Sequence, residues 1–334
     1  MKRTRGLYSR ISEYNNICDA FCKAAKGKHH QNDVITFKSQ FDKNIQDIRK
    51  QLINKKVVMG NYYFFLIHDP KLRSICAASF PERVLHHAIM NICEPILEKY
   101  AIYDSYACRK GKGTHRAIYR VQSYSKKYDW YLKLDIRRYF DSIDHFVMIK
   151  LLSKRFKDND LILLFQQWLD TYHTDIGKGV PIGSLLSQHF ANYYMSAFDH
   201  WIKRKLRIKG YLRYMDDFLL FSSDKEQLKD ALINIQNYLY DNLSLKLKDP
   251  IQLNKTNRGI PFLGFRVYPV KILLNHRSKT RFSRKFIAYE KKWVEGQWSD
   301  ERLLRNMNSL IEFTKVANAE GYRQRIIDRF GVPS

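Results

Sequence analysis

Two adjacent carboxylates, Asp216 and Asp217, lie at the centre of the segment YLRYMDDFLLF, whose other residues are nearly all aromatic or aliphatic. One interpretation is a plain hairpin tip, because Asp is a favoured turn residue. The apolar neighbours argue against it, since unpaired like charges in such surroundings are costly. A divalent metal would remove the conflict, because Mg²⁺ prefers a few carboxylates plus substrate phosphates. The pair is therefore a candidate metal site.

A third carboxylate, Asp135, ends the alternating, strand-like segment WYLKLDI. If that strand pairs beside the hairpin of residues 211–221, Asp135 and Asp216 meet at one edge of a sheet. Two metals about 4 Å apart, held by shared carboxylates, would activate a 3′-hydroxyl and stabilise a leaving pyrophosphate. The alternative role for Asp135 is the N-cap of the helix that follows, and we expect Asp141 and Asp144 to have capping or surface roles.

The elements that must position these residues follow from the hydrophobic periodicity. Apolar residues recur at helical spacing, and the shorter alternating runs read as strands. Strand, helices, hairpin, helix and strand follow in that order, which predicts an α+β fold with an antiparallel sheet backed by helices on one face. The expected helices are 41–52, 85–96, 189–206 and 228–239, the last opened by a Ser223–Glu226 capping box, and the expected strands are 130–136, 211–221 (a hairpin), 243–247 and 262–267.

The charge of the chain indicates a polyanionic partner. The 334 residues include 59 Lys and Arg against 33 Asp and Glu, a net charge of +26. Nucleic acid and an anionic membrane are both candidates. The 22 Tyr and 20 Phe interleaved with the basic residues favour nucleic acid, because rings stack on bases while cations meet phosphates. We expect a cytoplasmic protein with no membrane segment or secretion signal, and five Cys that are reduced core thiols.

Several motifs together resemble one family. YMDD (214–217) preceded by DIRRYF (135–140) resembles motifs C and A of reverse transcriptases. PERVLHHAIMNICEPILEKY, YACRKGKGTHRAI, GVPIGSLLSQHFANYYM and FLGF occur in the family's order and spacing, so the resemblance covers most of residues 5–270. It implies a right-hand polymerase fold with fingers and palm in residues 1–265, the fingers mainly in 1–125 and 146–190, and a basic helical thumb in 266–334.

The resemblance also implies roles for individual residues. It makes Asp135, Asp216 and Asp217 catalytic, and these residues with Ile136 hold two Mg²⁺ ions. Phe140 matches a steric gate against the 2′-hydroxyl, although a core aromatic is its alternative role. Lys71 and Arg73 match a fingers segment that grips the triphosphate, and solvated surface is their alternative. The full dNTP set is Lys71, Arg73, Arg137, Arg138, Tyr139, Phe140, Ile182, Gly183, Gln188 and Lys255, and the primer and template set is Arg109, Lys110, Lys112, Tyr214, Met215, Phe262, Leu263 and Gly264.

The segment PIGSLLSQ (181–188) distinguishes among reverse transcriptases. Many have Gln-Gly where this chain has Ile182-Gly183, and the IGxxxSQ form resembles enzymes of diversity-generating retroelements. Ile182 would remove hydrogen-bonding capacity beside the nascent base pair, which predicts low fidelity, with errors mainly opposite template adenines; alternatively, Ile182 only packs. The resemblance implies as partners a structured template RNA, cDNA, dNTPs and a small basic accessory protein, in a bacterial or phage-encoded system.

Some alternatives stay open. A related bacterial reverse transcriptase with a phage-defence role and a non-catalytic RNA-binding scaffold are the competing functions. The lysine that donates a proton after the hairpin is either Lys248 or Lys255. The segment SLIEFTKVANAEGYRQRI lacks the Gly-His pair that relatives carry, so the end of the thumb departs from the pattern.

Overall fold

The computed structural model describes residues 6–68 and 72–331, and its chain forms two compact units. The first comprises Met1–Tyr103, Asp135–Leu206 and Ile233–Lys248, and the second comprises Asp104–Leu134, Arg207–Leu232 and Asp249–Ser334. Each unit is thus assembled from separated stretches of sequence. Among the described residues no helix has both the length and the apolar character needed to cross a membrane.

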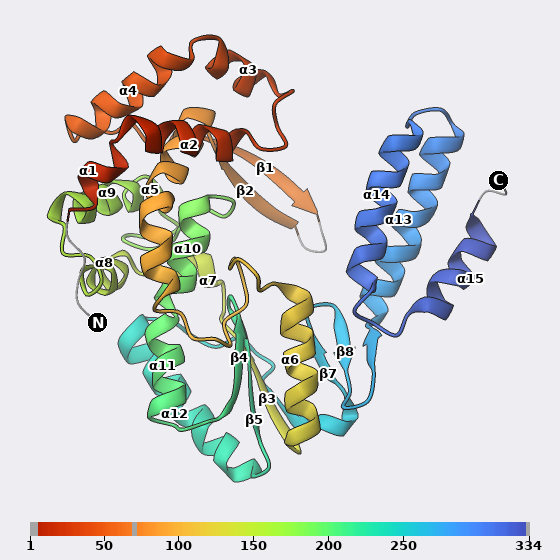
Figure 1. Cartoon of the computed structure of the whole chain (residues 1–334). Coiled ribbons are helices and arrows are strands. Elements are labelled where there is room, and N and C mark those ends of the chain that lie inside the picture. Colours follow the sequence, from red (N-terminus) through yellow and green to blue (C-terminus); the bar gives the residue numbers. More distant parts are fainter. Residues whose placement is uncertain (1–5, 69–71, 332–334) are drawn as a thin grey trace. The chain divides into compact units, whose positions relative to one another are not determined.

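The first unit begins with helices and a two-stranded hairpin. α2 packs on α5, and the strands β1 and β2 pair antiparallel from Tyr62↔Ala78 to His68↔Leu72 (Figure 1). The apolar stripes expected at 41–52 and 85–96 are confirmed, with Ile45 and Ile89 buried. The bounds are α1 Tyr8–Ile11, α2 Tyr14–Ala25, α3 Asn32–Ser39, α4 Phe41–Ile53, β1 Tyr62–His68, β2 Leu72–Ala78 and α5 Phe80–Glu98.

Further helices complete this unit, and one expected helix is divided. The segment 189–206 forms parts of two helices that meet at Met195. Beside the break, the Ser196 hydroxyl donates to the Asn192 carbonyl at 3.2 Å, a bond that competes with the backbone and bends helices. The bounds are α7 Tyr139–Ser142, α8 His145–Ser153, α9 Asn159–Leu169, α10 Leu185–Tyr194 and α11 Ser196–Arg204; α12, Lys225–Leu243, begins in the second unit and ends in the first.

The start of α12 and the segment after it differ from expectation. The Asp224 carboxylate, not a Ser223–Glu226 box, accepts the Glu226 N–H at 2.9 Å, because Asp224 is the residue next to the helix start. The expected strand 243–247 is wrong. Leu243 still belongs to the helix, and Ser244 stops it with a left-handed φ of 53°. Only an isolated bridge between Leu247 and Ile136 remains.

A four-stranded sheet in the order β4-β5-β3-β6 lies at the centre of the second unit. β4 pairs antiparallel with β5, and β3 pairs antiparallel with β6 from Trp130↔Lys255 to Lys133↔Gln252. β4 and β5 are almost entirely buried, which explains their nearly continuous apolar sequence. The bounds are β3 Trp130–Asp135, β4 Gly210–Tyr214, β5 Asp217–Ser222, β6 Gln252–Lys255 and, packed nearby, α6 Thr114–Lys127.

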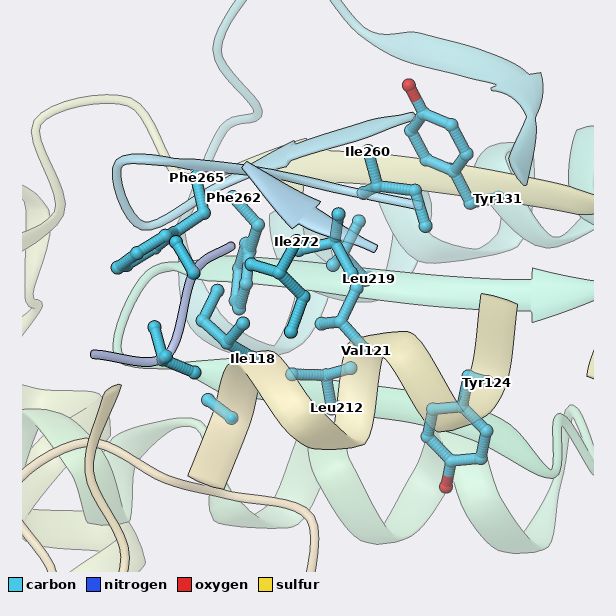
Figure 2. Packing of buried hydrophobic residues seen from close by; sticks show 14 of the residues in the cluster. Ile118, Val121, Tyr124, Tyr131, Leu212, Leu219, Ile260, Phe262, Phe265 and Ile272 are labelled. Carbon is cyan, nitrogen blue, oxygen red and sulfur yellow. The ribbon is translucent and has the colours of Figure 1, made fainter. Parts of the chain in front are cut away.

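The second unit also contains a three-stranded sheet, β7-β8-β9, and its main core. The expected single strand 262–267 is instead a hairpin, because Leu263 (φ 46°) and Gly264 (φ 89°) form a two-residue turn between Phe262 and Phe265. Figure 2 shows Ile118 of α6 packed among side chains from both sheets, including Leu219 of the four-stranded sheet and Phe262 of the three-stranded sheet. The bounds are β7 Ile260–Phe262, β8 Phe265–Val267 and β9 Ile272–Leu274, with a 3₁₀ turn at Thr256–Arg258.

The basic C-terminal segment is helical, as its sequence predicted. Phe282 and Phe286 of α13 and Met307 of α14 form a small core of their own. The bounds are α13 His276–Val294, α14 Asp300–Thr314 and α15 Glu320–Phe330. Its assignment as a thumb that starts at residue 266 stays a prediction.

The cysteines in the described residues are all free thiols, and only some belong to the core. Cys76 and Cys93 are buried, whereas Cys22 and Cys108 are exposed. Burial raises the pKa of the Cys76 thiol to about 12, which makes it unreactive at neutral pH. The expectation of core thiols is therefore wrong for the exposed pair, which lie on a helix surface and in a loop.

Candidate active site

The YMDD segment forms a tight turn between β4 and β5. Tyr214 pairs directly with Asp217, which leaves Met215 and Asp216 as the turn residues. Met215 has a φ of 58°, a left-handed conformation that non-glycine residues rarely adopt and that costs about 1–3 kcal/mol. The fully buried Arg213 stabilises this turn, because its guanidinium donates to the Met215 carbonyl at 2.9 Å. Arg213 therefore binds the backbone of the turn.

Asp217 has a partner that sequence reasoning missed. Its Oδ2 lies 3.2 Å from Nζ of Lys133, and both side chains are about four-fifths buried (19% and 18% exposed). This ammonium supplies positive charge at the apolar hairpin tip. Lys133 precedes Asp135 by two residues, so the alternation of β3 places both side chains on one face of the sheet. The two-residue spacing of Lys133 and Asp135 in the sequence could have indicated that Lys133 lies near the candidate carboxylates.

Asp135 ends β3, next to the segment that follows α12. Its carbonyl accepts the Lys248 N–H at 2.8 Å, and its Oδ2 lies 3.8 Å from Lys248 Nζ. The N-cap role considered for Asp135 is wrong, because Arg138 is the N-cap residue of α7. Asp144 does cap α8, accepting the Val147 N–H at 3.0 Å. Ile136 is buried and bridges to Leu247.

The donor chemistry of these carboxylates suits Mg²⁺. Within residues 6–68 and 72–331 no three His, Cys, Asp or Glu side chains gather as a metal cage. Mg²⁺ does not require one, because it commonly takes one or two carboxylates and completes its shell with waters and substrate phosphates. Asp135 and Asp217 each already attract an ammonium group, and both keep some solvent exposure. The residues therefore fit the ion by ligand type.

The two arginines after Asp135 line a cavity of about 320 Å³ in the first unit. Lys178 and Lys246 line it too, so cations outnumber the two acids in its wall. Arg138 has a left-handed φ of 47° and pairs with Asp141 at 3.0 Å, while the Arg137 N–H donates to the Lys246 carbonyl at 2.9 Å. Such a cavity would attract phosphate groups.

Tyr139 and Phe140 are packed differently. Tyr139 is buried, and its hydroxyl donates to the Ala191 carbonyl, so this side chain holds α7 against α10. Phe140 is only half-buried, with its ring centroid 5.8 Å from that of Tyr139. A half-buried ring is available to contact a ligand, whereas the Tyr139 ring is not.

The Ile182–Gly183 segment is attached to β2. The Ile182 carbonyl accepts the Cys76 N–H at 2.7 Å, and the Ile182 side chain is half-buried. Gly183 has a φ of 116°, and a Cβ there would lie 2.8 Å from the Cys76 carbonyl oxygen. β2 also carries Arg73, which is exposed. Gln188 lies half-buried on α10, and Lys71 lies outside the described residues.

The residues expected to contact primer and template lie in the second unit. Arg109 donates to the Ser105 carbonyl at 2.7 Å, and Lys112 Nζ lies 5.1 Å from the Tyr106 ring centroid. Gly264 has protein neighbours, since a Cβ there would lie 2.8 Å from Ser278 Oγ. The protein's own packing thus already requires this glycine. Lys110 is exposed, Tyr214 contacts Thr114 through its hydroxyl, Met215 and Phe262 are buried, and Leu263 is half-buried in its turn.

The two candidate lysines lie at opposite ends of β3. Lys248 contacts Asp135 at the last residue, whereas Lys255 pairs with Trp130 at the first. Five residues of extended chain span about 17 Å. The ammonium of Lys255 instead lies 5.5 Å from the Trp130 ring centroid. Lys248 is therefore the lysine beside a candidate catalytic carboxylate.

Comparisons with known proteins agree with these features. YkfC of Escherichia coli is 23% identical over 66% of this chain and 71% of its own, and the group II intron-encoded protein LtrA of Lactococcus lactis is 26% identical over 47% of this chain but only 25% of its own. The solved structure of apo telomerase from Candida tropicalis matches with a TM-score of 0.52 at 12% identity, over 88% of this chain and 64% of that one. This likeness concerns the fold and confirms the α+β right-hand polymerase class.

The family itself follows from the model of reverse transcriptases (RNA-dependent DNA polymerases), which matches residues 53–267. That range contains the YMDD turn, Asp135 and the Ile182–Gly183 segment. The expectation of an RNA-directed DNA polymerase is confirmed at the level of the family. The chain belongs to the reverse transcriptase family.

Proposed function

We propose that the chain is the reverse transcriptase of a diversity-generating retroelement, which copies a structured template RNA into error-prone cDNA. The observation that carries this proposal is the segment PIGSLLSQ, with Ile182 where many reverse transcriptases have Gln. The attachment of this segment to β2 supports the proposal, because it holds Ile182 on the same unit as Arg73. A small basic accessory protein and the template RNA are the proposed partners, in a bacterial cytoplasm.

The proposed chemistry divides among few residues. Asp135, Asp216 and Asp217, with the backbone of Ile136, would hold two Mg²⁺ ions. When bound, such ions lower the pKa of an attacking hydroxyl and neutralise charge on the leaving pyrophosphate. Lys248, whose Nζ lies 3.8 Å from Asp135 Oδ2, would supply a proton to that leaving group.

Substrate selection is assigned to side chains of the first unit. The basic cavity of Arg137, Arg138, Lys178 and Lys246 would attract the triphosphate by its charge. The half-buried Phe140 ring would pack under the sugar and leave no room for a 2′-hydroxyl. Deoxynucleotides would then be favoured over ribonucleotides.

The first test is DNA synthesis on a primed RNA. The wild type should incorporate dNTPs with Mg²⁺, and Asp216→Asn should lose incorporation by a factor of about 10³ or more, because a neutral amide holds the ion poorly. The matched control is Asp224→Asn, which changes the same chemical group at the start of α12. Incorporation by neither the wild type nor the variant would favour the non-catalytic scaffold.

The second test reads the error spectrum of the cDNA. Ile182→Gln should reduce misincorporation opposite template adenines, because an amide restores hydrogen bonding beside the nascent pair. Ile182→Leu is the control, since it keeps an apolar side chain of equal size, and its spectrum should match the wild type. Identical spectra for the wild type and Ile182→Gln would refute the role of this position.

A group II intron-type reverse transcriptase is the second candidate, favoured by the similarity to LtrA. The two candidates differ in the errors they predict. Sparse errors spread over all four template bases in the wild-type cDNA would favour the intron-type enzyme. Errors concentrated at adenines would favour the retroelement enzyme, and would equally count against a related defence enzyme that copies faithfully.

A further inference from the structure

A short segment of the second unit, residues 104–106, extends the central sheet beside the YMDD turn. β4 is an end strand of that sheet, and Ser105 bridges to its residue Arg213 in the parallel sense. The Arg213 N–H donates to the Asp104 carbonyl, and the Tyr106 N–H donates to the Arg213 carbonyl, both at 2.9 Å. The segment is therefore bonded to the residue that directly precedes the turn.

The side chain of Ser105 reaches the same turn through a guanidinium group. Arg213 donates one terminal N–H to the Met215 carbonyl at 2.9 Å and the other to the Ser105 hydroxyl at 3.3 Å. Both Arg213 and Ser105 are fully buried. Because a guanidinium is planar and its donors have fixed directions, these two bonds together orient the group. Ser105, which lies 108 residues before Arg213, thus helps to hold the group that holds Met215.

The turn needs such support because its backbone is strained. Met215 has a φ of 58°, and a non-glycine residue keeps this left-handed conformation only where its surroundings enforce it. Asp216 is the next residue, so the direction of its carboxylate depends on the backbone of Met215. A turn that relaxes would move the candidate metal ligand Asp216 away from the position that the native backbone gives it.

The segment is itself anchored to α6. The carboxylate of Asp104 is buried and accepts from Arg120 Nε at 2.8 Å and from the Tyr124 hydroxyl at 2.9 Å, and both donors lie on α6. Charge-assisted bonds of this kind are among the stronger hydrogen bonds in proteins. α6 packs against β4 in the main core, where Ile118 and Leu212 are both buried (Figure 2). Asp104 therefore fixes the segment to a well-packed helix.

The same segment supports the basic loop that follows it. The Gly113 N–H donates to the Tyr106 carbonyl at 3.0 Å, and the Arg109 guanidinium donates to the Ser105 carbonyl at 2.7 Å. These bonds use backbone oxygens, whereas the turn is held through the Ser105 hydroxyl. Replacing the Ser105 side chain should therefore release the turn and leave the loop in place.

We propose that Ser105 is a positioning residue for the YMDD turn, which acts through Arg213 to keep Asp216 and Asp217 in the geometry that binds metal. Asp104 contributes indirectly, because it anchors the segment that carries Ser105. The inference rests on the proposed function, which assigns the two carboxylates as metal ligands. It connects the candidate active site to a hydroxyl that the catalytic motifs do not include.

Hydrogen exchange of the full chain tests the link without metal, substrate or catalysis. Ser105→Ala should accelerate exchange of the amides of residues 213–217 by roughly tenfold, because loss of a buried hydrogen bond makes local opening easier. Exchange in the first unit should stay as in the wild type. Ser125→Ala is the matched control, since it removes another buried hydroxyl of the second unit, one that donates to the Gln122 carbonyl at 2.9 Å on α6. It should leave the turn unchanged.

The magnesium dependence of primer extension tests the consequence for the site. Ser105→Ala should raise the half-saturating Mg²⁺ concentration by roughly tenfold, the scale seen when a group that supports a metal ligand is removed. The affinity for a fluorescent primer–template should be unchanged, because alanine keeps the carbonyl that Arg109 contacts. Asp104→Asn should shift the Mg²⁺ dependence in the same direction. Ser125→Ala should match the wild type in both measurements.

The possible results separate this inference from the proposed function. The inference is overturned if Ser105→Ala leaves exchange at residues 213–217 unchanged, if exchange rises evenly along the chain, or if Ser125→Ala has the same local effect. An unchanged Mg²⁺ dependence in Ser105→Ala would also overturn it. If the wild type makes no DNA while exchange in Ser105→Ala rises only at the turn, the proposed function fails and the support of the turn by Ser105 stands.

Discussion

Single side chains set the electrostatics around the candidate carboxylates. Asp217 lies beside Lys133 and Asp135 beside Lys248, so an ammonium group accompanies each of the two acids. The Lys133–Asp217 pair is mostly buried and is therefore screened less than the more exposed Lys248–Asp135 pair. The buried Arg213 adds a different contribution, because it fixes the backbone of the YMDD turn.

The lysine beside Asp135 should matter more than the one at the start of β3. Lys248→Ala should lower the single-turnover rate of nucleotide addition by about 100-fold, the scale of general acid catalysis. Lys255→Ala should cause a much smaller loss, because its ammonium lies against Trp130. Rapid-quench primer extension measures both rates, and equal losses for the two variants would contradict the assignment.

At the scale of elements, backbone groups rather than side chains attach the Ile182–Gly183 segment to β2. The Cys76–Ile182 hydrogen bond and the positive φ of Gly183 bring two backbones close together. A side chain at residue 183 would meet a carbonyl oxygen that belongs to a paired strand and cannot easily move. Glycine is therefore required at this position for both conformation and space.

Gly183→Ala should lower the free energy of unfolding by about 2–4 kcal/mol, from strained φ and the clash together. Gly177→Ala is the control, because Gly177 also has a positive φ but has open space around it. It should cost about 1 kcal/mol. Urea unfolding monitored by circular dichroism measures both values, and equal costs would exclude a contribution from the close approach to Cys76.

His87 of helix α5 should make the folding stability of the protein decrease in acid. Burial, together with the nearby Lys23, lowers the pKa of His87 from 6.5 to about 4. Between these values the unfolded chain binds a proton that the folded chain does not, so stability falls as the pH drops through this window. His87→Gln should unfold with a weaker dependence on pH between about 6.5 and 4. An unchanged pH dependence in urea titrations would contradict this prediction.

At the scale of the whole molecule, the excess of basic residues should determine how the affinity for RNA depends on salt. A net charge of +26 implies that binding to RNA releases many counterions. The affinity for RNA should therefore fall steeply as salt rises, with a logarithmic slope of about −0.7 to −0.9 for each phosphate contacted.

If Lys110 contacts a template or primer phosphate, as proposed, Lys110→Ala should reduce the magnitude of that slope by somewhat less than one unit, because one such contact would be lost. Lys110→Arg keeps the charge and should leave the slope unchanged. Fluorescence anisotropy with labelled template RNA over a salt series measures both. A slope that is identical in all three proteins would show that Lys110 lies away from the bound RNA.

Much of the local structure and the family could be predicted from the sequence. The helical stripes of α4 and α5 and the hairpin of β4 and β5 were readable because burial of one face imposes a period on the residues. The secondary-structure predictions were wrong where a short segment fits the strand period but belongs in part to a neighbouring helix. The segment LSLKL alternates like a strand, yet packing of the preceding helix extends to Leu243. Two-residue turns such as Leu263–Gly264 also cannot be predicted from hydrophobic periodicity, because the turn residues interrupt the alternating pattern of the strands.

The sequence by itself determined the reverse transcriptase family, the candidate carboxylates and the basic character, because these depend on residue types and spacing along the chain. Only the tertiary structure decided which lysine accompanies which carboxylate, that Tyr139 is buried while Phe140 remains half-exposed, and that a cavity of about 510 Å³ lies beside Tyr63. These features depend on strand register and on the packing of segments far apart in sequence, and no local pattern encodes them.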